Sequence, residues 1–357
     1  AGPTVLTLRP VLDDLFAALG ERLEDHITLH RQPLIARHFW PDGSRLDLWD
    51  DPARNAEAIR AFAGPRAAAQ FMAFTRRARA LFDGFDAPMM QNAVPAPATL
   101  AAHCLRHPRL LPLMSPLSTL AGSLARQFDD PRLAQLFGRY ATYIGGSPYR
   151  VPALLALIWQ AEVAGVWTVA GGMHRLAQTL AALAEARGAS FLYDAHVARI
   201  EATQTVNGVT LADGTILPAD LVLFNGDPRA LATGTLGPQV TECAPQTVST
   251  KRSLSADVWA FAARATGPEL AYHNVFFRAD PKPEFDALEQ GRRVPDPTLY
   301  ICAMDRAGPA PPPALERFEI IANAPPLPAP VPEVSQCNAR CFPTLARFGL
   351  SFDPIPD

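Results

Sequence analysis

The sequence predicts a mixed α/β fold whose later part is closer to α+β, with helices, a small antiparallel meander and a second antiparallel sheet following one another along the chain. Three observations lead to this fold class. Apolar residues recur at three- and four-residue steps over residues 51–160, two hairpin signals lie near residue 210, and strand-like segments dominate after residue 236. A chain of 357 residues suffices for two domains, or for one large domain interrupted by another.

The charge and cysteine content narrow the class of protein. Lysine and arginine number 32 against 35 aspartates and glutamates, so the chain lacks a basic excess and we expect no nucleic-acid partner. Its five cysteines are an odd number at irregular spacings, which indicates free thiols in a reducing compartment. The longest apolar run, residues 151–159, is shorter than the roughly 18 to 20 residues of a spanning helix.

The first 50 residues predict one helix and one hairpin. The helix covers residues 11–19 and ends at Gly20, while strands over 34–40 and 45–49 are joined by the Pro-Asp-Gly-Ser turn at 41–44. Helices follow from Asp51 onward, because an aspartate that can cap stands before a proline at the first helical position. The same pair recurs at 130–131, which predicts a helix running toward residue 143. One apolar helical face consists of Phe71, Phe74, Ala78 and Leu81.

Residues 173–227 predict a helix, a meander and a buried strand. The helix has Leu176, Leu180 and Leu183 on one face and ends at Gly188. Strands are expected over 190–193 and 197–203, with hairpin turns at Asn207-Gly208 and Asp213-Gly214. The apolar run 220–224 is typical of a strand buried on both faces of a parallel sheet, and ligands of such sheets bind beyond the strand ends, here at 225–227.

The last third of the chain predicts a mainly antiparallel sheet. Its expected strands cover residues 247–262, 274–278, 298–304 and 316–323, and an amphipathic helix begins near Cys337. The opening Ala-Gly-Pro-Thr-Val and the closing Pro-Ile-Pro-Asp lead us to interpret the chain as a piece of a longer polypeptide.

The sequence lacks the common motifs of nucleotide hydrolysis, serine hydrolases and metal sites. No GxxxxGK[ST] phosphate loop occurs, and Gly145-Gly146-Ser147-Pro148-Tyr149 departs from the nucleophile-elbow pattern at its fifth position. The histidine pairs 26/30 and 103/107 share the four-residue spacing of metal ligands but lack the HExxH glutamate and a third ligand. We therefore expect no metal site.

The segment from Arg139 to Met173 carries the clearest candidate site. It contains the glycine pairs 145–146 and 171–172, which allow a close backbone approach to a flat ligand, and Trp167, a large planar side chain. Each pair alone is equally compatible with an ordinary turn.

Taken in order, these motifs resemble the carotenoid (phytoene-type) desaturases, which are FAD-binding flavoproteins. The matching stretches are Gly2-Pro3-Thr4, IGGSPY at 144–149, Gly165-Val166-Trp167 through Gly171-Gly172-Met173, and the meander that ends at Asn225-Gly226-Asp227. The resemblance covers essentially the whole chain. RYATYIGGSPY and Asn-Gly-Asp-Pro look most like the purple-bacterial members that introduce the 3,4 double bond into 1-hydroxy- or methoxy-neurosporene.

The resemblance implies a set of site residues. Gly2, Pro3 and Thr4 would lie near the flavin ring, with Gly171 and Gly172 close to it. The resemblance further places Val197 at the adenine side and Asn225 and Asp227 in the cofactor cleft, while Tyr143 and Trp167 would line the substrate cavity. A strand exit at Asn225 and a meander core position for Val197 are the plain structural alternatives. Arg139 and Glu162 would flank the cavity, where a structural ion pair or solvent exposure is favoured over proton transfer.

The implied fold is an FAD-binding dinucleotide-type fold, incomplete here, with an inserted helical and antiparallel-sheet substrate domain. Its parts would be residues 1–10 (end of a flavin-binding segment), 11–164 (substrate and membrane-associated domain), 165–236 (FAD-binding segment with the meander), 237–333 (substrate-domain sheet) and 334–357 (start of a C-terminal segment). The family's GxGxxG motif does not occur in the chain, so we expect this polypeptide alone to bind FAD weakly and to be inactive.

The implied chemistry transfers a hydride from an allylic C–H to the flavin and removes a proton from the next carbon, which needs no catalytic triad. A carotenoid substrate dissolves in the bilayer, and the leucines and arginines of residues 93–128 suit a peripheral contact with the inner photosynthetic membrane from the cytoplasmic side, although a helix pair facing the core explains them equally. A phytoene desaturase or carotenoid isomerase shares these motifs. A lipid-binding protein without a redox cofactor is the alternative of another class.

Overall fold

A computed structural model describes residues 4–93, 96–308 and 311–356. These residues form two compact units, each described here by itself. The large unit runs up to Thr179 and resumes at Ser253, and the small unit is Leu180–Arg252. Helix α9, His174–Glu185, contains the boundary between them.

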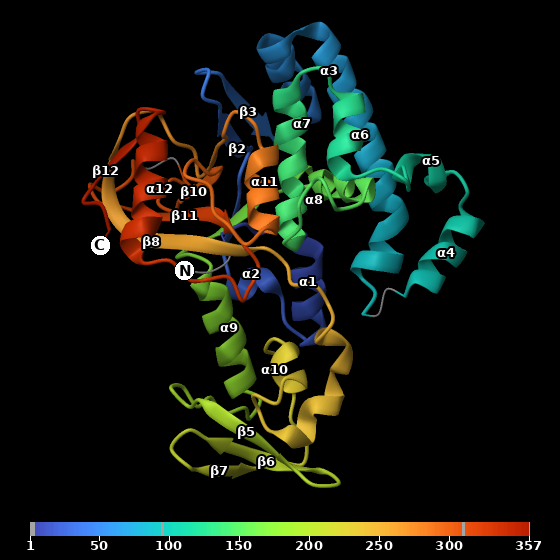
Figure 1. The fold of residues 1–357 in the computed structure, drawn as a ribbon, viewed down its shortest axis with the longest axis vertical. Helices are drawn as coiled ribbons and strands as arrows, with labels where there is room; N and C mark the ends of the chain where they lie inside the picture. The colour runs from blue at the N-terminus through green and yellow to red at the C-terminus, as the bar shows by residue number, and fades with distance from the viewer. Residues whose placement is uncertain (1–3, 94–95, 309–310, 357) are drawn as a thin grey trace. The chain divides into compact units, whose positions relative to one another are not determined.

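The large unit combines a helical layer with a twisted sheet (Figure 1). Its helices are α1 (Arg9–Ala18), α2 (Leu23–His26), α3 (Pro52–Phe85), α4 (Pro97–Arg106), α5 (Leu110–Met114), α6 (Leu120–Gln127), α7 (Pro131–Gly138), α8 (Ile158–Val163), α11 (Lys282–Glu289) and α12 (Val334–Ala346). Shorter helical turns are η1 (Asp86–Met90), η2 (Arg139–Ile144) and η3 (Ala153–Leu157).

Seven strands form the main sheet in the order β12-β8-β11-β10-β9-β2-β3. Their bounds are β2 (Leu34–Phe39), β3 (Arg45–Trp49), β8 (Ser255–Thr266), β9 (His273–Phe276), β10 (Leu299–Ala303), β11 (Glu316–Ala324) and β12 (Ser351–Asp353). Every neighbouring pair is antiparallel except β2 with β9, which is parallel. The expected mainly antiparallel sheet is therefore confirmed, and the N-terminal hairpin forms one edge of it.

The two faces of this sheet pack against different partners. One face contributes Phe276, Ile301 and Ile320 to a core shared with Cys341 and Leu345 of α12. The opposite face turns toward the helical layer. A separate small sheet pairs β1 (Leu29–Arg31) with β4 (Trp167–Val169), and Leu6 forms an isolated bridge with Trp167.

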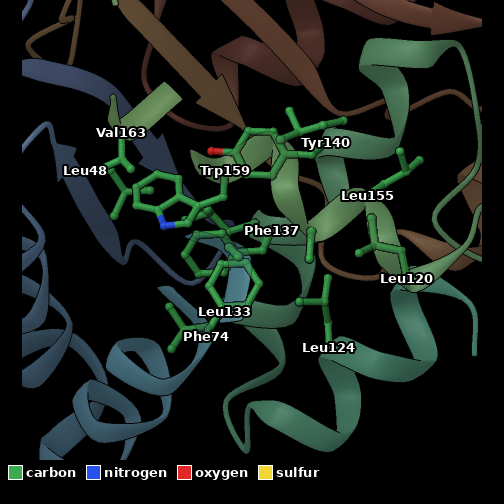
Figure 2. Packing of buried hydrophobic residues seen from close by; sticks show 14 of the residues in the cluster. Leu48, Phe74, Leu120, Leu124, Leu133, Phe137, Tyr140, Leu155, Trp159 and Val163 are labelled. Carbon is green, nitrogen blue, oxygen red and sulfur yellow. The ribbon is translucent and has the colours of Figure 1, made fainter. Parts of the chain in front are cut away.

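The helical layer is held together by a cluster of large aromatic side chains. Phe137 of α7 lies between Phe74 of α3 and Trp159 of α8, with ring centroids 4.5 Å and 5.4 Å away, and all three are almost fully buried. Figure 2 shows Tyr140 and Leu133 completing this group. Aromatic pairs in these geometries add to the free energy of burial, so the cluster fixes how the helices lie over the sheet.

Local sequence signals explain where the principal helices begin. The Asp51 carboxylate accepts a hydrogen bond from the amide of Ala53, and the Asp130 carboxylate accepts one from Arg132, so both predicted caps are confirmed. Helix α3 kinks at Gly64, which has φ 91° and ψ 173° and precedes Pro65. The predicted apolar face of this helix is buried.

The small unit contains the predicted three-stranded meander. Its strands are β5 (Val197–Ala202), β6 (Val206–Leu211) and β7 (Ile216–Pro218), in the order β5-β6-β7, followed by α10 (Arg229–Ala232), η4 (Pro238–Cys243) and η5 (Pro245–Thr247). The Asp213-Gly214 turn is confirmed, with Gly214 at φ 89° and the Asp213 carboxylate accepting from the Thr215 amide. Its core is small and centres on Ile200, Leu236 and Val240.

Several expected elements are absent from the described residues. Asn207-Gly208 lies inside β6 rather than in a turn, because the chain reverses at residues 203–205. Residues 190–193 and 220–224 form no strand, and Leu221 and Leu223 are 71% and 86% exposed. A strand buried on both faces needs a paired neighbour on each side, and no described strand pairs with 220–224. Strand β8 begins at Ser255 rather than at 247.

The helical stretch predicted between residues 93 and 128 is present as α4, α5 and α6. Among the described residues, no helix is both long enough and apolar enough to cross a bilayer.

Candidate active site

The large unit encloses a cavity of about 580 Å³, within the range of about 300–1,000 Å³ typical of small-molecule sites. Most of its wall is apolar. The wall is built by α7 and η2 on one side and by the sheet strands β9, β10 and β11 on the other. Its lining includes Thr4, Val5, Gln135, Gly138, Arg139, Tyr143, Val275, Phe277, Tyr300, Ile321 and Asn323.

Strand register explains which sheet residues face this cavity. Tyr300 of β10 lies opposite Val275 of β9 and Ile321 of β11, so the three side chains form one row across the sheet. Because side chains two residues apart share a face, His273 and Cys302 form the next row on the same side. The alternate residues point into the opposite core.

Arg139 and Glu162 form the buried ion pair that the sequence favoured. Arg139 Nη2 lies 3.4 Å from Glu162 Oε2, and the Tyr140 hydroxyl donates to the same oxygen at 2.6 Å. The Tyr143 hydroxyl donates to the other carboxylate oxygen. The carboxylate side chain is 3% exposed, so its charge is neutralised inside the protein by one guanidinium and two hydroxyls.

Tyr143 connects this network to the cavity. It lines the cavity and is 45% exposed, whereas Tyr140 is fully buried. Burial and then the Glu162 carboxylate raise the pKa of Tyr140 well above its usual value, so this phenol stays protonated and donates. The sequence prediction that Tyr143 lies at a cavity agrees with this position.

A second polar group reaches the cavity from the sheet. The Tyr300 hydroxyl lies 2.9 Å from Thr4 Oγ1 and 2.6 Å from His273 Nδ1. His273 is buried and its Nε2 has no hydrogen-bond partner. Burial, followed by the positive charge of Arg139, lowers the pKa of His273 to about 3, so the imidazole is neutral.

Sequence reasoning missed Tyr300 and His273. A polar His-Asn pair at 273–274 inside an otherwise apolar run was a usable signal, since a buried polar residue in a strand requires a partner. Their connection to Thr4, 296 positions from Tyr300, had no sequence signal.

The segment after Thr4 lies beside the segment that leads to the second glycine pair. Leu6 forms an isolated antiparallel bridge with Trp167, four residues before Gly171. Gly171 and Gly172 have φ of 83° and 92°, and no atom lies within 4 Å of where a Cβ would stand. Trp167 itself packs over Gly165 and is not among the cavity-lining residues described.

The other residues predicted to contact the cofactor do not belong to the described part of the large unit. Gly2 and Pro3 lie outside the described residues. Val197, Asn225 and Asp227 belong to the small unit. There Val197 begins β5, and the Asp227 carboxylate accepts from the Arg229 amide at 3.0 Å while pairing with Arg252 at 2.6 Å.

Comparison with known proteins identifies the family. The family model described as flavin containing amine oxidoreductase matches residues 7–261. A protein named hydroxyneurosporene desaturase from Cereibacter sphaeroides is 52% identical over the whole chain and 72% of its own length. Proteins of the same name from Rhodobacter capsulatus and Rubrivivax gelatinosus are 50% and 41% identical over the whole chain, covering 72% and 70% of their lengths.

Solved structures agree at the level of the fold. A fatty acid isomerase from P. acnes superposes with a TM-score of 0.56 at 13% identity, over 100% of this chain and 72% of that one. An oxidoreductase from Methanosarcina mazei gives 0.52 at 14% identity, over 97% and 69%. The chain belongs to the flavin-containing amine oxidoreductase family and, within it, to the carotenoid desaturases. The predicted FAD-dependent oxidoreductase class is thereby confirmed.

The residues present fit a flat flavin ring. Two adjacent glycines with positive φ and open space beside them would offer bare backbone to such a ring, and Thr4 lines the mostly apolar cavity.

Proposed function

We propose that this protein introduces the 3,4 double bond into 1-hydroxy- or methoxy-neurosporene, as an FAD-dependent carotenoid desaturase. Support comes from the similarity over the full chain to proteins named hydroxyneurosporene desaturase. The structural observation that carries the proposal is a mostly apolar cavity in which the buried Arg139 charge is paired with Glu162, as an apolar polyene requires.

The reaction removes a hydride from one carbon and a proton from its neighbour. When bound, FAD supplies the hydride acceptor. The chain positions the polyene between the sheet row of Val275, Tyr300 and Ile321 and the helical wall, and excludes water from the reacting bond. Positive charge that develops beside the polyene is delocalised by the substrate itself, so no charged protein group need touch it.

The proposal also includes the residues that contact the FAD cofactor. We assign Thr4, Gly171 and Gly172 to the flavin ring in the large unit. In the small unit, Val197, Asn225 and Asp227 stay the residues that we predict to contact the cofactor, within the FAD-binding segment 165–236.

The test is expression from the complete reading frame with added 1-hydroxyneurosporene and membranes. We expect bound flavin, and a product that is lighter by two hydrogens and absorbs at longer wavelength, detected by chromatography with mass detection. Bound flavin without this product would move the function to another carotenoid, as in phytoene desaturation or isomerisation. Absence of flavin would favour the lipid-binding alternative.

We further propose a peripheral membrane contact made by the segment containing α4 and α5. Leu105, Leu111 and Leu117 are 80%, 40% and 101% exposed, and Arg106 and Arg109 lie beside them in the sequence. Exposed leucines next to arginines suit the interface of a membrane with anionic lipids, here the inner photosynthetic membrane on its cytoplasmic side.

Replacing Leu105, Leu111 and Leu117 together by Ser should release the protein from vesicles of anionic lipid in a co-sedimentation assay. Leu110 and Leu113 pack against the core, so substituting them would confuse membrane release with unfolding. A matched control replaces the exposed Leu221, Leu223 and Ile216 of the small unit by Ser and should leave sedimentation unchanged. Undiminished sedimentation of the α4–α5 variant would refute the contact.

A further inference from the structure

One polar group stands out on the sheet side of the cavity. Tyr300 and Thr4 both line it, and their hydroxyls are joined at 2.9 Å. Behind them, His273 Nδ1 lies 2.6 Å from the Tyr300 hydroxyl. The order Thr4–Tyr300–His273 forms a hydrogen-bonded chain that begins at the cavity wall and ends in the buried sheet.

This chain has spare hydrogen-bonding capacity. The Tyr300 hydroxyl has one proton, so it donates either to His273 or to Thr4, and the imidazole tautomer follows. Because His273 Nε2 has no partner, neither direction is fixed by a bond further inside. Thr4 Oγ1 can therefore donate to, or accept from, a third group in the cavity.

Two other polar side chains at the wall, Gln135 and Tyr143, are already engaged. Gln135 accepts from the Trp40 indole at 2.9 Å and donates to the Arg278 carbonyl at 2.7 Å. The Tyr143 proton goes to Glu162. The Thr4–Tyr300 pair, in contrast, is a neutral group at the wall that can bind a polar atom of a ligand.

The hydrogen-bonded chain Thr4–Tyr300–His273 is uncharged, which suits an alcohol or an ether as its ligand. His273 is neutral, and burial raises the pKa of Tyr300 well above its usual value, so no member carries a charge that would suit a carboxylate or phosphate. A group able both to donate and to accept can bind a hydroxyl in either direction, and can donate to a methoxy oxygen.

The position of the Thr4–Tyr300 pair also suits a 1-hydroxycarotenoid. In a 1-hydroxycarotenoid a single carbon separates the hydroxyl-bearing carbon from the 3,4 bond, so the hydroxyl must lie close to the reacting atoms. Thr4 lines the cavity and stands two residues before Leu6, which bridges Trp167 four residues before the Gly171–Gly172 pair that we assign to the flavin ring.

We propose that Tyr300 and Thr4 bind the carbon-1 oxygen of the substrate and thereby select oxygenated over unoxygenated carotenoid ends. The inference rests on the proposed function for the identity of the ligand. An unoxygenated end would leave this polar pair facing hydrocarbon without a partner, which lowers its affinity.

The test compares Tyr300→Phe with the unaltered enzyme, both expressed from the complete reading frame. Binding of 1-hydroxyneurosporene and of neurosporene is measured by quenching of tryptophan fluorescence, and turnover is followed separately. We expect Tyr300→Phe to weaken binding of the hydroxylated ligand about 10- to 100-fold while changing neurosporene binding less than about threefold. Thr4→Val should change the preference in the same direction.

Tyr272→Phe is the matched control, because the Tyr272 ring packs against His273 and Tyr272 is not among the described lining residues of the cavity. It should retain the preference. Equal weakening of both ligands in both site variants, or no weakening, would overturn the inference. A preference that Tyr300→Phe abolishes, without any desaturated product from the unaltered enzyme, would support the inference and count against the proposed function.

Discussion

At the residue scale, the buried Glu162 carboxylate is stabilised by the groups around it. It receives a guanidinium and two phenol hydroxyls in a place where an unpaired ion would be costly. Burial by itself would lower the pKa of Arg139, but Tyr143 and Glu162 more than offset it and raise that pKa. The Arg139 charge at the mostly apolar cavity wall is consequently paired inside the protein.

Glu162→Gln should destabilise the protein by about 3–5 kcal/mol, since it leaves the Arg139 charge buried without a counter-ion. Denaturant unfolding measures the change. Glu289→Gln is the matched control, because Glu289 pairs with an Arg150 side chain that is 75% exposed, and it should cost about 0–1 kcal/mol. Similar losses in both variants would argue against a buried ion pair.

The two buried histidines make stability depend on pH. Burial, followed by the Arg139 charge, lowers the pKa of both His38 and His273 to about 3, against about 6.5 in an unfolded chain. Below pH 6.5 the unfolded state therefore binds protons that the folded state does not. The contribution of each histidine is fully present above pH 6.5 and is lost progressively as the pH falls toward 3.

Between pH 7.5 and 5.5 each histidine should lower the unfolding free energy by about 1.4 kcal/mol. His38→Gln should remove that share of the loss, as measured by urea unfolding at the two values. His30→Gln, at an exposed position, is the matched control. A His38→Gln variant with the full pH dependence would show that His38 titrates normally.

At the element scale, two adjacent residues cause the kink of α3, and the kink changes how the helix packs. Gly64 has φ 91°, a conformation that L side chains rarely adopt, and Pro65 cannot donate the next helical bond. Ile59 on one side of the kink and Phe71 on the other are both fully buried. The change of direction lets both halves of the helix contribute to one core.

Gly64→Ala should destabilise the protein by about 1–3 kcal/mol through backbone strain alone, because no atom lies within 4 Å of the new methyl group. Gly138→Ala provides the comparison. Gly138 has helical φ −65° and ordinary contacts around its Cβ position, so alanine there should stabilise by about 0.4–1 kcal/mol. Thermal unfolding distinguishes the two, and a neutral Gly64→Ala would mean that the kink relaxes without strain.

At the scale of the whole molecule, the two units differ in how much apolar surface they bury. The small unit centres on three buried side chains, whereas the large unit contains two extended clusters. Free energies of local opening follow the density of such contacts.

Amides of β5 and β6 should therefore exchange with solvent at a lower opening free energy than those of β10 and β11 in native-state hydrogen exchange. Ile200→Ala should accelerate exchange in the small unit by removing its central side chain, at a cost of about 2–5 kcal/mol. Exchange in β10 serves as the internal control and should not change. Uniform acceleration in both units would indicate a single cooperative fold.

The sequence by itself determined the features that depend on neighbouring residues. The hairpin at 34–49, the caps at Asp51 and Asp130 and the Asp213-Gly214 turn follow from a few adjacent residues, because capping bonds and turn conformations are local. The motifs in 139–173 and 225–227 likewise sufficed to identify the family, and the family supplied the cofactor and the reaction class.

Only the tertiary structure decided which distant residues meet. Asn207-Gly208 has the strongest local turn signal and still lies within β6, and the apolar run 220–224 has strand composition without a strand partner. The Thr4–Tyr300–His273 chain depends on the register of β9 with β10 and on a side-chain contact between residues almost 300 positions apart. The physical reason is that pairing and burial are properties of the neighbours a segment acquires on folding, and those neighbours are not encoded in its own residues.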